Sequence, residues 1–293
     1  MEFWYMSGRK PIPNAVKKVL RSEVRFGCPV KGCGNPYLEY HHFDPPVSVK
    51  PHNDPEGMIA LCAQHHKKAD GGTYTIGQLH ALKRDKANAD LVKGNLDWLR
   101  KDLLAVVGGN FYYETPKIIT IDNIDLVSLV RDEDGYLRLN INMLSLDPEE
   151  RIIIEDNSWE NIGTPVDLRS PPQGKELEVS YSNGDYLYLR FIELKSKEQA
   201  IKKYGHDIFS NLVFPLTAVE VNMTIAGTRI ELTPQNSQIG GLQMTGCLSS
   251  YCGGGVLIQN SGLYWRQNPI WKRQTLVEET EHPNVIKVNF GCR

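Results

Sequence analysis

The chain of 293 residues contains no run of about 18 apolar residues, the length that a membrane-spanning helix needs. Its first residues, from Met1 to Tyr5, lack the basic flank and apolar stretch of a secretory signal peptide. Only six cysteines are present, and three of them lie among clustered histidines, so their even number is no argument for disulfides. These absences predict a cytoplasmic protein that does not bind a membrane.

The chain also has little net charge, −2, but its charged residues are unevenly distributed. Residues 1–105 carry 16 basic and 11 acidic residues, whereas the remainder carries 17 basic and 24 acidic residues. A basic N-terminal part suits a polyanion such as nucleic acid, whose phosphates attract lysine and arginine. A solvated basic face explains the same imbalance. Charge therefore supports nucleic-acid binding without establishing it.

Histidines are concentrated in one short region. Five of the eight fall within residues 41–66, and they include two adjacent pairs, His41-His42 and His65-His66. Random placement would give about 0.2 adjacent pairs. The same region is bordered by three of the cysteines: Cys28, Cys33 and Cys62. Thiolate and imidazole bind zinc, and imidazole transfers protons near neutral pH. This region therefore predicts a metal site with proton chemistry beside it.

Four of these residues match the ligands of a structural zinc ion: Cys28, Cys33, Cys62 and His65. Four residues separate the first two and two separate the last two, and both spacings let a pair reach one ion from a tight turn. Such an ion would organise a segment too rich in proline and polar residues to fold by core burial alone. Three buried free cysteines and a surface histidine are the alternative.

His41, His42 and His66 then remain for catalysis. Phosphodiester hydrolysis requires a nucleophilic water, stabilisation of charge on the phosphate oxygens and help for the leaving oxygen. A divalent metal can supply the last two, and a neutral imidazole can deprotonate the water. On a strand, adjacent rings point to opposite faces, so both reach one site only if the strand bends, as Pro45-Pro46 could enforce. Two surface histidines beside a structural zinc are the alternative.

Over about residues 25–90 the sequence resembles the HNH (ββα-metal) endonuclease family. The resemblance rests on Cys28 and on three segments: Glu39-Tyr40-His41-His42-Phe43-Asp44, Asn53-Asp54-Pro55-Glu56-Gly57-Met58-Ile59-Ala60-Leu61-Cys62 and His65-His66-Lys67-Lys68-Ala69-Asp70. It implies that His41 ligates the catalytic metal and that His42 activates water. It also implies that His66 is a further ligand, and that Asp70 ligates the metal or orients water there.

Two positions depart from the family pattern. His65 replaces the second cysteine of the usual Cys-x-x-Cys pair and remains a competent zinc ligand. The middle asparagine of the family, which orients the general base, aligns with Gly57. The backbone carbonyl of Gly57 or the side chain of Asn53 would have to take that role, and the sequence does not choose between them. Loss of activity is the other implication.

The predicted organisation has three parts: a basic segment over residues 1–20, the HNH domain with trailing helices over 21–109, and a β-rich accessory domain over 110–293. Asn14 is expected to cap a helix that ends at Leu20. Thr75 and Gln78 predict a capping box for a helix from Ile76 to about Lys86. On that helix three cations would contact phosphates: Lys83, Arg84 and Lys86.

A further helix is expected over residues 96–107, where leucine and valine recur at helical spacing before Gly108-Gly109. Beyond residue 110, alternating runs predict strands at 136–143, 151–155, 177–181, 186–194, 219–225 and 229–232, with one helix at 197–204. Asn183-Gly184 predicts a hairpin, and 239–262 is glycine-rich. The fold class is therefore α+β, with a small zinc-stabilised ββα-metal domain and a larger all-β domain, sandwich or solenoid-like. Cys247 and Cys252 are expected to be unpaired buried thiols.

The sequence thus predicts a metal-dependent endonuclease that acts on double-stranded DNA, with structural Zn²⁺ and one catalytic Mg²⁺ or Mn²⁺. The resemblance suggests bacterial or phage restriction or defence. A non-catalytic zinc module that binds nucleic acid or a protein is the alternative, and Gly57 is its best support. Residues 110–293 match no catalytic pattern and are expected to form homo-oligomers, bind a partner or bind a regulatory ligand.

Overall fold

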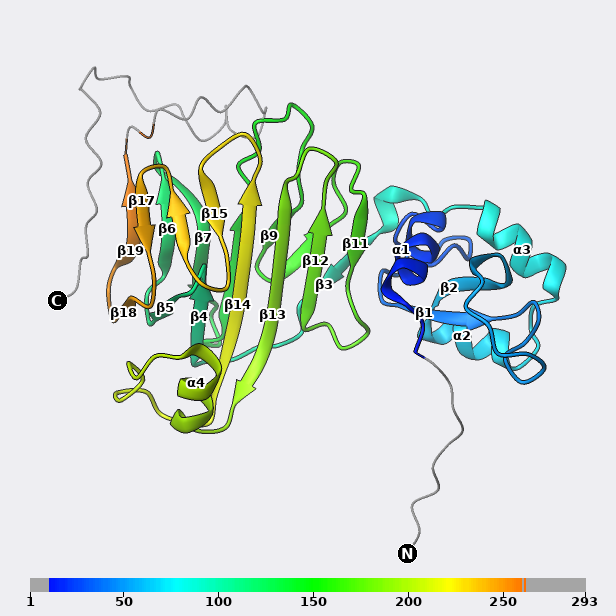
Figure 1. The fold of residues 1–293 in the computed structure, drawn as a ribbon, viewed down its shortest axis with the longest axis horizontal. Helices are drawn as coiled ribbons and strands as arrows, with labels where there is room; N and C mark the ends of the chain where they lie inside the picture. The colour runs from blue at the N-terminus through cyan, green and yellow to red at the C-terminus, as the bar shows by residue number, and fades with distance from the viewer. Residues whose placement is uncertain (1–10, 260, 262–293) are drawn as a thin grey trace, which may run out of the picture. The chain divides into compact units, whose positions relative to one another are not determined.

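The computed structural model describes residues 11–259 and 261 (Figure 1), and in this range the protein is mixed α+β, mostly sheets with four α-helices. Two compact units divide the chain, Met1–Val92 and Lys93–Arg293. The division falls before the predicted boundary after Gly109, because the strands between residues 93 and 107 pair only with strands of the second unit. The predicted basic segment lies partly in residues 1–10, outside the described residues.

The first unit contains three helices, two 3₁₀ turns and a two-stranded sheet: α1 (Asn14–Glu23), β1 (Leu38–His42), η1 (Pro55–Gly57), β2 (Met58–Cys62), α2 (Ala63–Asp70), α3 (Ile76–Arg84) and η2 (Ala89–Leu91). β1 and β2 pair antiparallel, with Leu38 opposite Cys62 and His42 opposite Met58. All five residues of β2 are buried, since the strand crosses the centre of this core. α2 follows β2 directly, which gives the order strand, strand, helix.

Two predicted helices of this unit form, with changes at their ends. The capping box of α3 is confirmed, because the side chain of Thr75 accepts from the N–H of Gln78 and the Gln78 side chain accepts from the N–H of Thr75. The helix ends at Arg84 instead of Lys86. α1 begins at Asn14, but Pro13 is its N-cap and no side chain caps it, so the predicted role of Asn14 is wrong.

Over its described residues, the second unit contains two sheets and one helix. One sheet has the order β19 (Gly254–Ile258), β6 (Lys117–Ile121), β7 (Ile124–Arg131), β8 (Leu137–Asn142), β9 (Ile153–Glu155), β10 (Ser158–Glu160) and β3 (Lys93–Asn95). The main path of the other is β11 (Asp167–Arg169), β12 (Glu176–Ser180), β13 (Tyr186–Leu194), β14 (Leu216–Ile225), β15 (Ile230–Leu232), β16 (Ser237–Ile239) and β17 (Leu242–Met244). β4 (Leu103–Val107), β5 (Asn110–Tyr113) and β18 (Leu248–Ser250) extend it beside β14, and the helix is α4 (Lys197–Tyr204).

The two sheets form two layers (Figure 1), and most neighbouring strands pair antiparallel. A solenoid would instead stack parallel rungs, so the arrangement is that of a sandwich. Buried and half-buried residues alternate along β8, as its sequence predicts. In its described part, the glycine-rich segment follows β16 and forms the short strands β17, β18 and β19. The hairpin between β12 and β13 and the helix α4 also form where they were predicted.

The predicted helix over residues 96–107 is wrong. Its last five residues, Leu103 to Val107, form β4, which pairs parallel with β14 and antiparallel with β5. Every residue of β4 is buried. A contiguous apolar run fits a strand that is covered on both faces. Burial between neighbouring strands therefore outweighs the helical spacing of the leucines in this segment. Gly108 and Gly109 have φ angles of 54° and 71° and form the turn between β4 and β5.

Two further sequence predictions for this unit concern cysteine and the membrane. Cys247 is an exposed free thiol and Cys252 is buried and disulfide-bonded, so the prediction of two unpaired buried thiols is wrong. Among the described residues, no helix is long and apolar enough to cross a membrane.

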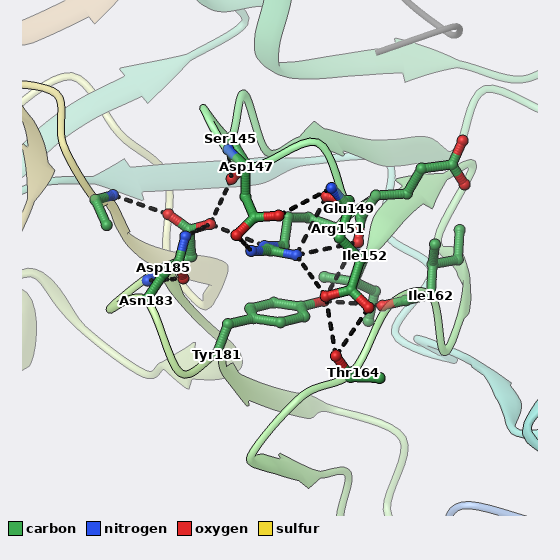
Figure 2. A network of polar contacts seen from close by, with 12 residues as sticks. Ser145, Asp147, Glu149, Arg151, Ile152, Ile162, Thr164, Tyr181, Asn183 and Asp185 are labelled. Atoms are coloured by element: carbon green, nitrogen blue, oxygen red, sulfur yellow. Dashed lines mark hydrogen bonds and ion pairs between the residues drawn. The ribbon is translucent and has the colours of Figure 1, made fainter. Parts of the chain in front are cut away.

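A buried carboxylate ties the two sheets together at one end of the second unit (Figure 2). Asp185 lies in the turn between β12 and β13, and its side chain is fully buried. It accepts hydrogen bonds from four groups: Ser145 Oγ, Arg151 Nε, Asn183 Nδ2 and the backbone N–H of Ala226. Burial alone would raise the pKa of Asp185, but these donors hold the pKa below its ordinary value.

Arg151, the cation of this network, precedes β9 in the opposite sheet. Its guanidinium lies 4.3 Å from the centre of the Tyr181 ring, and it contacts Asp147 and Glu149 as well as Asp185. The hydroxyl of Tyr181 accepts from the N–H of Ile152. The network therefore joins the β12–β13 hairpin to the segment between β8 and β9 (Figure 2).

Replacing Asp185 with asparagine removes the charge that compensates a buried guanidinium. We expect the free energy of unfolding to fall by about 3 kcal/mol, within the range for breaking a buried ion pair. Asp147→Asn is the matched control, because Asp147 also contacts Arg151 but its side chain is 33% exposed. It should cost about 1 kcal/mol or less. Urea denaturation distinguishes the two, and equal losses would contradict the assignment.

Candidate functional site

The four predicted zinc ligands come together in the first unit and are named here the cysteine cluster: Cys28, Cys33, Cys62 and His65. His65 Nδ1 lies 3.3 Å from Cys28 Sγ and 3.2 Å from Cys62 Sγ, and the sulfurs of Cys33 and Cys62 are 3.9 Å apart. Tetrahedral zinc separates two sulfurs by about 3.8 Å and a sulfur from a nitrogen by about 3.6 Å. The cluster is largely buried and can hold a zinc ion.

A tight turn between α1 and β1 places two of these cysteines. The N–H of Cys33 donates to Val30 O and the N–H of Gly34 donates to Cys28 O. Gly34 has a φ of 60°, and a Cβ at this position would lie 2.4 Å from the Cβ of Leu91. The turn therefore requires glycine, and it aims both thiols at the start of α2.

Burial shifts the pKa values of the thiols and of the imidazole in opposite directions. It raises the pKa of the Cys28 and Cys62 thiols, backbone hydrogen bonds oppose this, and the charge of Cys33 raises both pKa values further. Burial lowers the pKa of His65, and the positive charge of Lys68 lowers it further. The imidazole is therefore neutral at pH 7. A divalent cation would replace the thiol protons and compensate the thiolate charges.

A second group of possible ligands, named here the imidazole cluster, consists of His41, His66 and Asp70. His41 Nδ1 lies 3.1 Å from Asp70 Oδ1, and His66 Nδ1 lies 3.6 Å from Asp70 Oδ2. The two rings meet edge to face, with centres 5.2 Å apart. β1 supplies His41, while His66 and Asp70 are four residues apart and so share one face of α2.

His41 is largely buried, with 10% of its side chain exposed. Burial lowers its pKa, and the neighbouring His66 lowers the pKa further, although Asp70 opposes both. His41 therefore stays neutral to lower pH than an ordinary histidine. Neutral imidazole is the form that ligates a metal.

The imidazole cluster opens into a cavity of 920 Å³. The residues that line it include all three members of the cluster and every other predicted catalytic residue: His41, His66, Asp70, His42 and Asn53. Lys17 of α1 and His52 line the same cavity. The structure therefore places all five of these residues around one space, on a different side of α2 from the cysteine cluster.

His41 and His42 both line this cavity, and the regular pairing of β1 ends directly after them. The N–H groups of Phe43 and Asp44 both donate to the single carbonyl of Gly57, at 2.9 Å and 3.2 Å. Two residues thus oppose one, as in a bulge, which turns the end of a strand. The pairing of β1 with β2 is regular up to His42 opposite Met58, so this departure from it comes after His42 and before Pro45.

The ring of His42 is oriented by a backbone carbonyl. His42 Nε2 lies 3.0 Å from His52 O, and because a carbonyl oxygen only accepts, Nε2 carries the proton. Neutral His42 then has its lone pair on Nδ1. His52 is itself held at both nitrogens, since Nε2 donates to Pro45 O and Nδ1 accepts from the N–H of Asp54. His52 thus takes the orienting role that we expected of Gly57 or Asn53.

Position 57 has no room for a side chain. A Cβ there would lie 1.8 Å from Asp44 O and 2.8 Å from His52 Cε1. The absence of a side chain lets the β1–β2 connection close against the residues that follow His42. A side chain at position 57 would therefore displace Asp44, which follows His42 closely, or the ring of His52.

Lys83, one of the three predicted phosphate contacts, makes contacts within the first unit. Its side chain is 9% exposed, and its ammonium contacts Glu23 Oε2 at 3.3 Å and donates to Pro55 O. These contacts hold α3 against α1 and η1. Arg84 and Lys86 are exposed.

Sequence reasoning overlooked two residues beside the imidazole cluster, His52 and Glu39. Glu39 Oε2 lies 3.1 Å from His66 Nδ1. Strand alternation could have identified Glu39, because it lies two residues before His41 and so on the same face of β1. No local pattern identifies His52, since its carbonyl meets His42 only through the loop between β1 and β2.

Comparisons of the chain with models of protein families, with curated proteins and with solved structures found no match.

If the cysteine cluster holds zinc, replacing Cys62 with serine should remove the ion and destabilise the first unit, because a hydroxyl is a poor substitute for thiolate. We expect zinc content, measured by atomic emission, and the melting temperature to fall together. Cys247→Ser is the control, since Cys247 is an exposed free thiol in the second unit and should change neither quantity. A stable Cys62→Ser protein that retains its zinc would refute the site.

Replacing Gly57 with asparagine should damage the fold, because the added Cβ would overlap Asp44 O. We expect Gly57→Asn to lower the free energy of unfolding by about 1–3 kcal/mol, as for other overpacked sites. At Gly77, in α3, a Cβ would meet no atom within 4 Å, so Gly77→Asn should not destabilise the protein. Chemical denaturation of both variants tests this, and an unchanged Gly57→Asn protein would contradict the explanation.

Proposed function

We propose that the protein is a metal-dependent endonuclease that hydrolyses phosphodiester bonds in nucleic acid, with double-stranded DNA as its substrate. One observation carries the proposal: a histidine with an oriented ring, His42, and the imidazole cluster line one cavity. The resemblance of residues 25–90 to HNH endonucleases supports the same conclusion. The strand-strand-helix order of β1, β2 and α2 is consistent with it.

The donor set of the imidazole cluster suits a divalent ion. Two imidazoles and a carboxylate ligate Mn²⁺ readily, and the carboxylate also suits Mg²⁺. His41, His66 and Asp70 would hold the ion. When bound, it would supply positive charge to the phosphate and to the leaving oxygen.

His42 is the proposed general base. Because its Nε2–H donates to His52 O, Nδ1 is the atom that can accept a proton from water. This hydrogen bond limits the rotamers of His42, so the lone pair on Nδ1 keeps one direction. His52 acts through His42 and is a positioning residue.

The surroundings of the cavity favour an anionic substrate. Lys17 of α1 lines it, and its ammonium lies 6.0 Å from the centre of the Tyr40 ring. Lys18 of the same helix is exposed. Cations here would contact phosphates and so position the backbone without reading its sequence.

The second unit is proposed to act as an accessory module. Residues 93–293 contain 20 basic and 26 acidic residues, a balance that repels DNA phosphates. A partner protein, a second copy of the chain or a regulatory ligand suits this unit better than a nucleic-acid duplex. Restriction or defence in a bacterium or phage remains the biological setting that the family resemblance suggests.

The proposal is tested with supercoiled plasmid and the purified full chain, with and without Mn²⁺ or Mg²⁺. We expect nicked and linear products only with the added ion. A mobility-shift assay on the same DNA addresses the rival function. Binding without cleavage under all ion conditions would reject the enzyme and favour a non-catalytic zinc module.

Removing the proposed base should abolish cleavage while leaving the fold intact. We expect His42→Ala to reduce the nicking rate about 10²–10⁴-fold, the usual contribution of general-base catalysis, with zinc content unchanged. His80→Ala is the control, because His80 is partly exposed on α3 and does not line the cavity. Unchanged nicking by His42→Ala would reject its role.

A further inference from the structure

Two elements each contribute one acid and one imidazole to the same place. On β1, Glu39 and His41 share a face because they are two residues apart. On α2, His66 and Asp70 share a face because they are four apart. Each acid meets the imidazole of the other element: Glu39 Oε2 lies 3.1 Å from His66 Nδ1, and Asp70 Oδ1 lies 3.1 Å from His41 Nδ1.

Glu39 nevertheless does not belong to the group of candidate metal ligands. Among the described residues, His41, His66 and Asp70 offer ligand atoms within 4.8 Å of one another, and Glu39 is not part of this group. Glu39 is also absent from the residues that line the 920 Å³ cavity, whereas the other three line it. Glu39 thus contacts His66 without lining the cavity and without belonging to the group of candidate ligands.

We propose that Glu39 is the carboxylate that fixes the tautomer of His66 for metal binding, an inference that rests on the proposed function. In this role the carboxylate of Glu39, 3.1 Å from His66 Nδ1, holds the ring proton on Nδ1 and leaves the lone pair on Nε2 for the ion. Asp70 Oδ2 is farther from Nδ1, at 3.6 Å, beyond hydrogen-bonding distance. Glu39 is therefore the main partner of this nitrogen.

The arrangement matches a general property of metal sites. A ligating histidine usually donates its other ring N–H to a carboxylate, which orients the ring and increases the basicity of the ligating nitrogen. Without Glu39, His66 could rotate or exchange its proton between nitrogens, and the ion would have to select the competent form. Metal affinity would fall, although no ligand had been removed.

The test measures Mn²⁺ affinity of the zinc-loaded full chain from the electron paramagnetic resonance signal of free Mn²⁺. We expect Glu39→Ala to weaken binding about 10–100-fold, the usual loss for such a carboxylate. Glu39→Gln keeps an acceptor oxygen and should recover most of that loss. Glu56→Ala is the matched control, because Glu56 lines a separate cavity that shares no residue with the first.

The outcomes separate this inference from the proposed function. It is overturned if the wild-type chain binds no Mn²⁺, if Glu39→Ala binds as tightly as the wild type, or if Glu39→Gln binds as weakly as Glu39→Ala. If the affinities follow the expected order while the wild-type chain cuts no plasmid, the role of Glu39 stands and the proposed function fails.

Discussion

The position of α2 is the constraint on which both candidate metal sites depend. Cys62 ends β2 and His65 lies in the first turn of α2, so the cysteine cluster anchors the start of the helix to the turn that holds Cys28 and Cys33. Adjacent residues on a helix differ by about 100° in direction. His65 therefore turns toward the thiols, and His66 turns toward β1 and the cavity. The start of α2 thus supplies His65 to the cysteine cluster and His66 to the imidazole cluster.

Separation of the two clusters has a chemical consequence. Thiolates favour zinc and buried tetrahedral sites, whereas imidazole with carboxylate suits ions that retain open positions. A cluster that is closed and largely buried can stabilise a unit with a small core, and a cluster at the edge of a cavity can exchange ligands with solvent. The acids near His41 and His66 are partly exposed, with 39% of the Glu39 side chain and 59% of the Asp70 side chain accessible.

The second unit is stabilised by different means. Its two layers bury apolar strand faces, and the connection between them at one end depends on the charged network around Asp185. Such a network is costly unless every donor and acceptor is paired. Asp185 meets this requirement with four donors drawn from both sheets. The pairing also explains why a carboxylate follows Asn183-Gly184 in the hairpin turn.

The local sequence was enough to predict those features that depend on residues within one short segment. The spacing of Cys28 with Cys33 and of Cys62 with His65 indicated the cysteine cluster, and Thr75 with Gln78 indicated the capping box, because each pair lies within a single turn. Tertiary structure alone decided that residues 103–107 form a strand, since β5 and β14 cover them, and that Cys252 is disulfide-bonded. It alone also brought His52 O to His42 and Glu39 to His66, because these contacts join groups on different segments and leave no periodic trace in the chain.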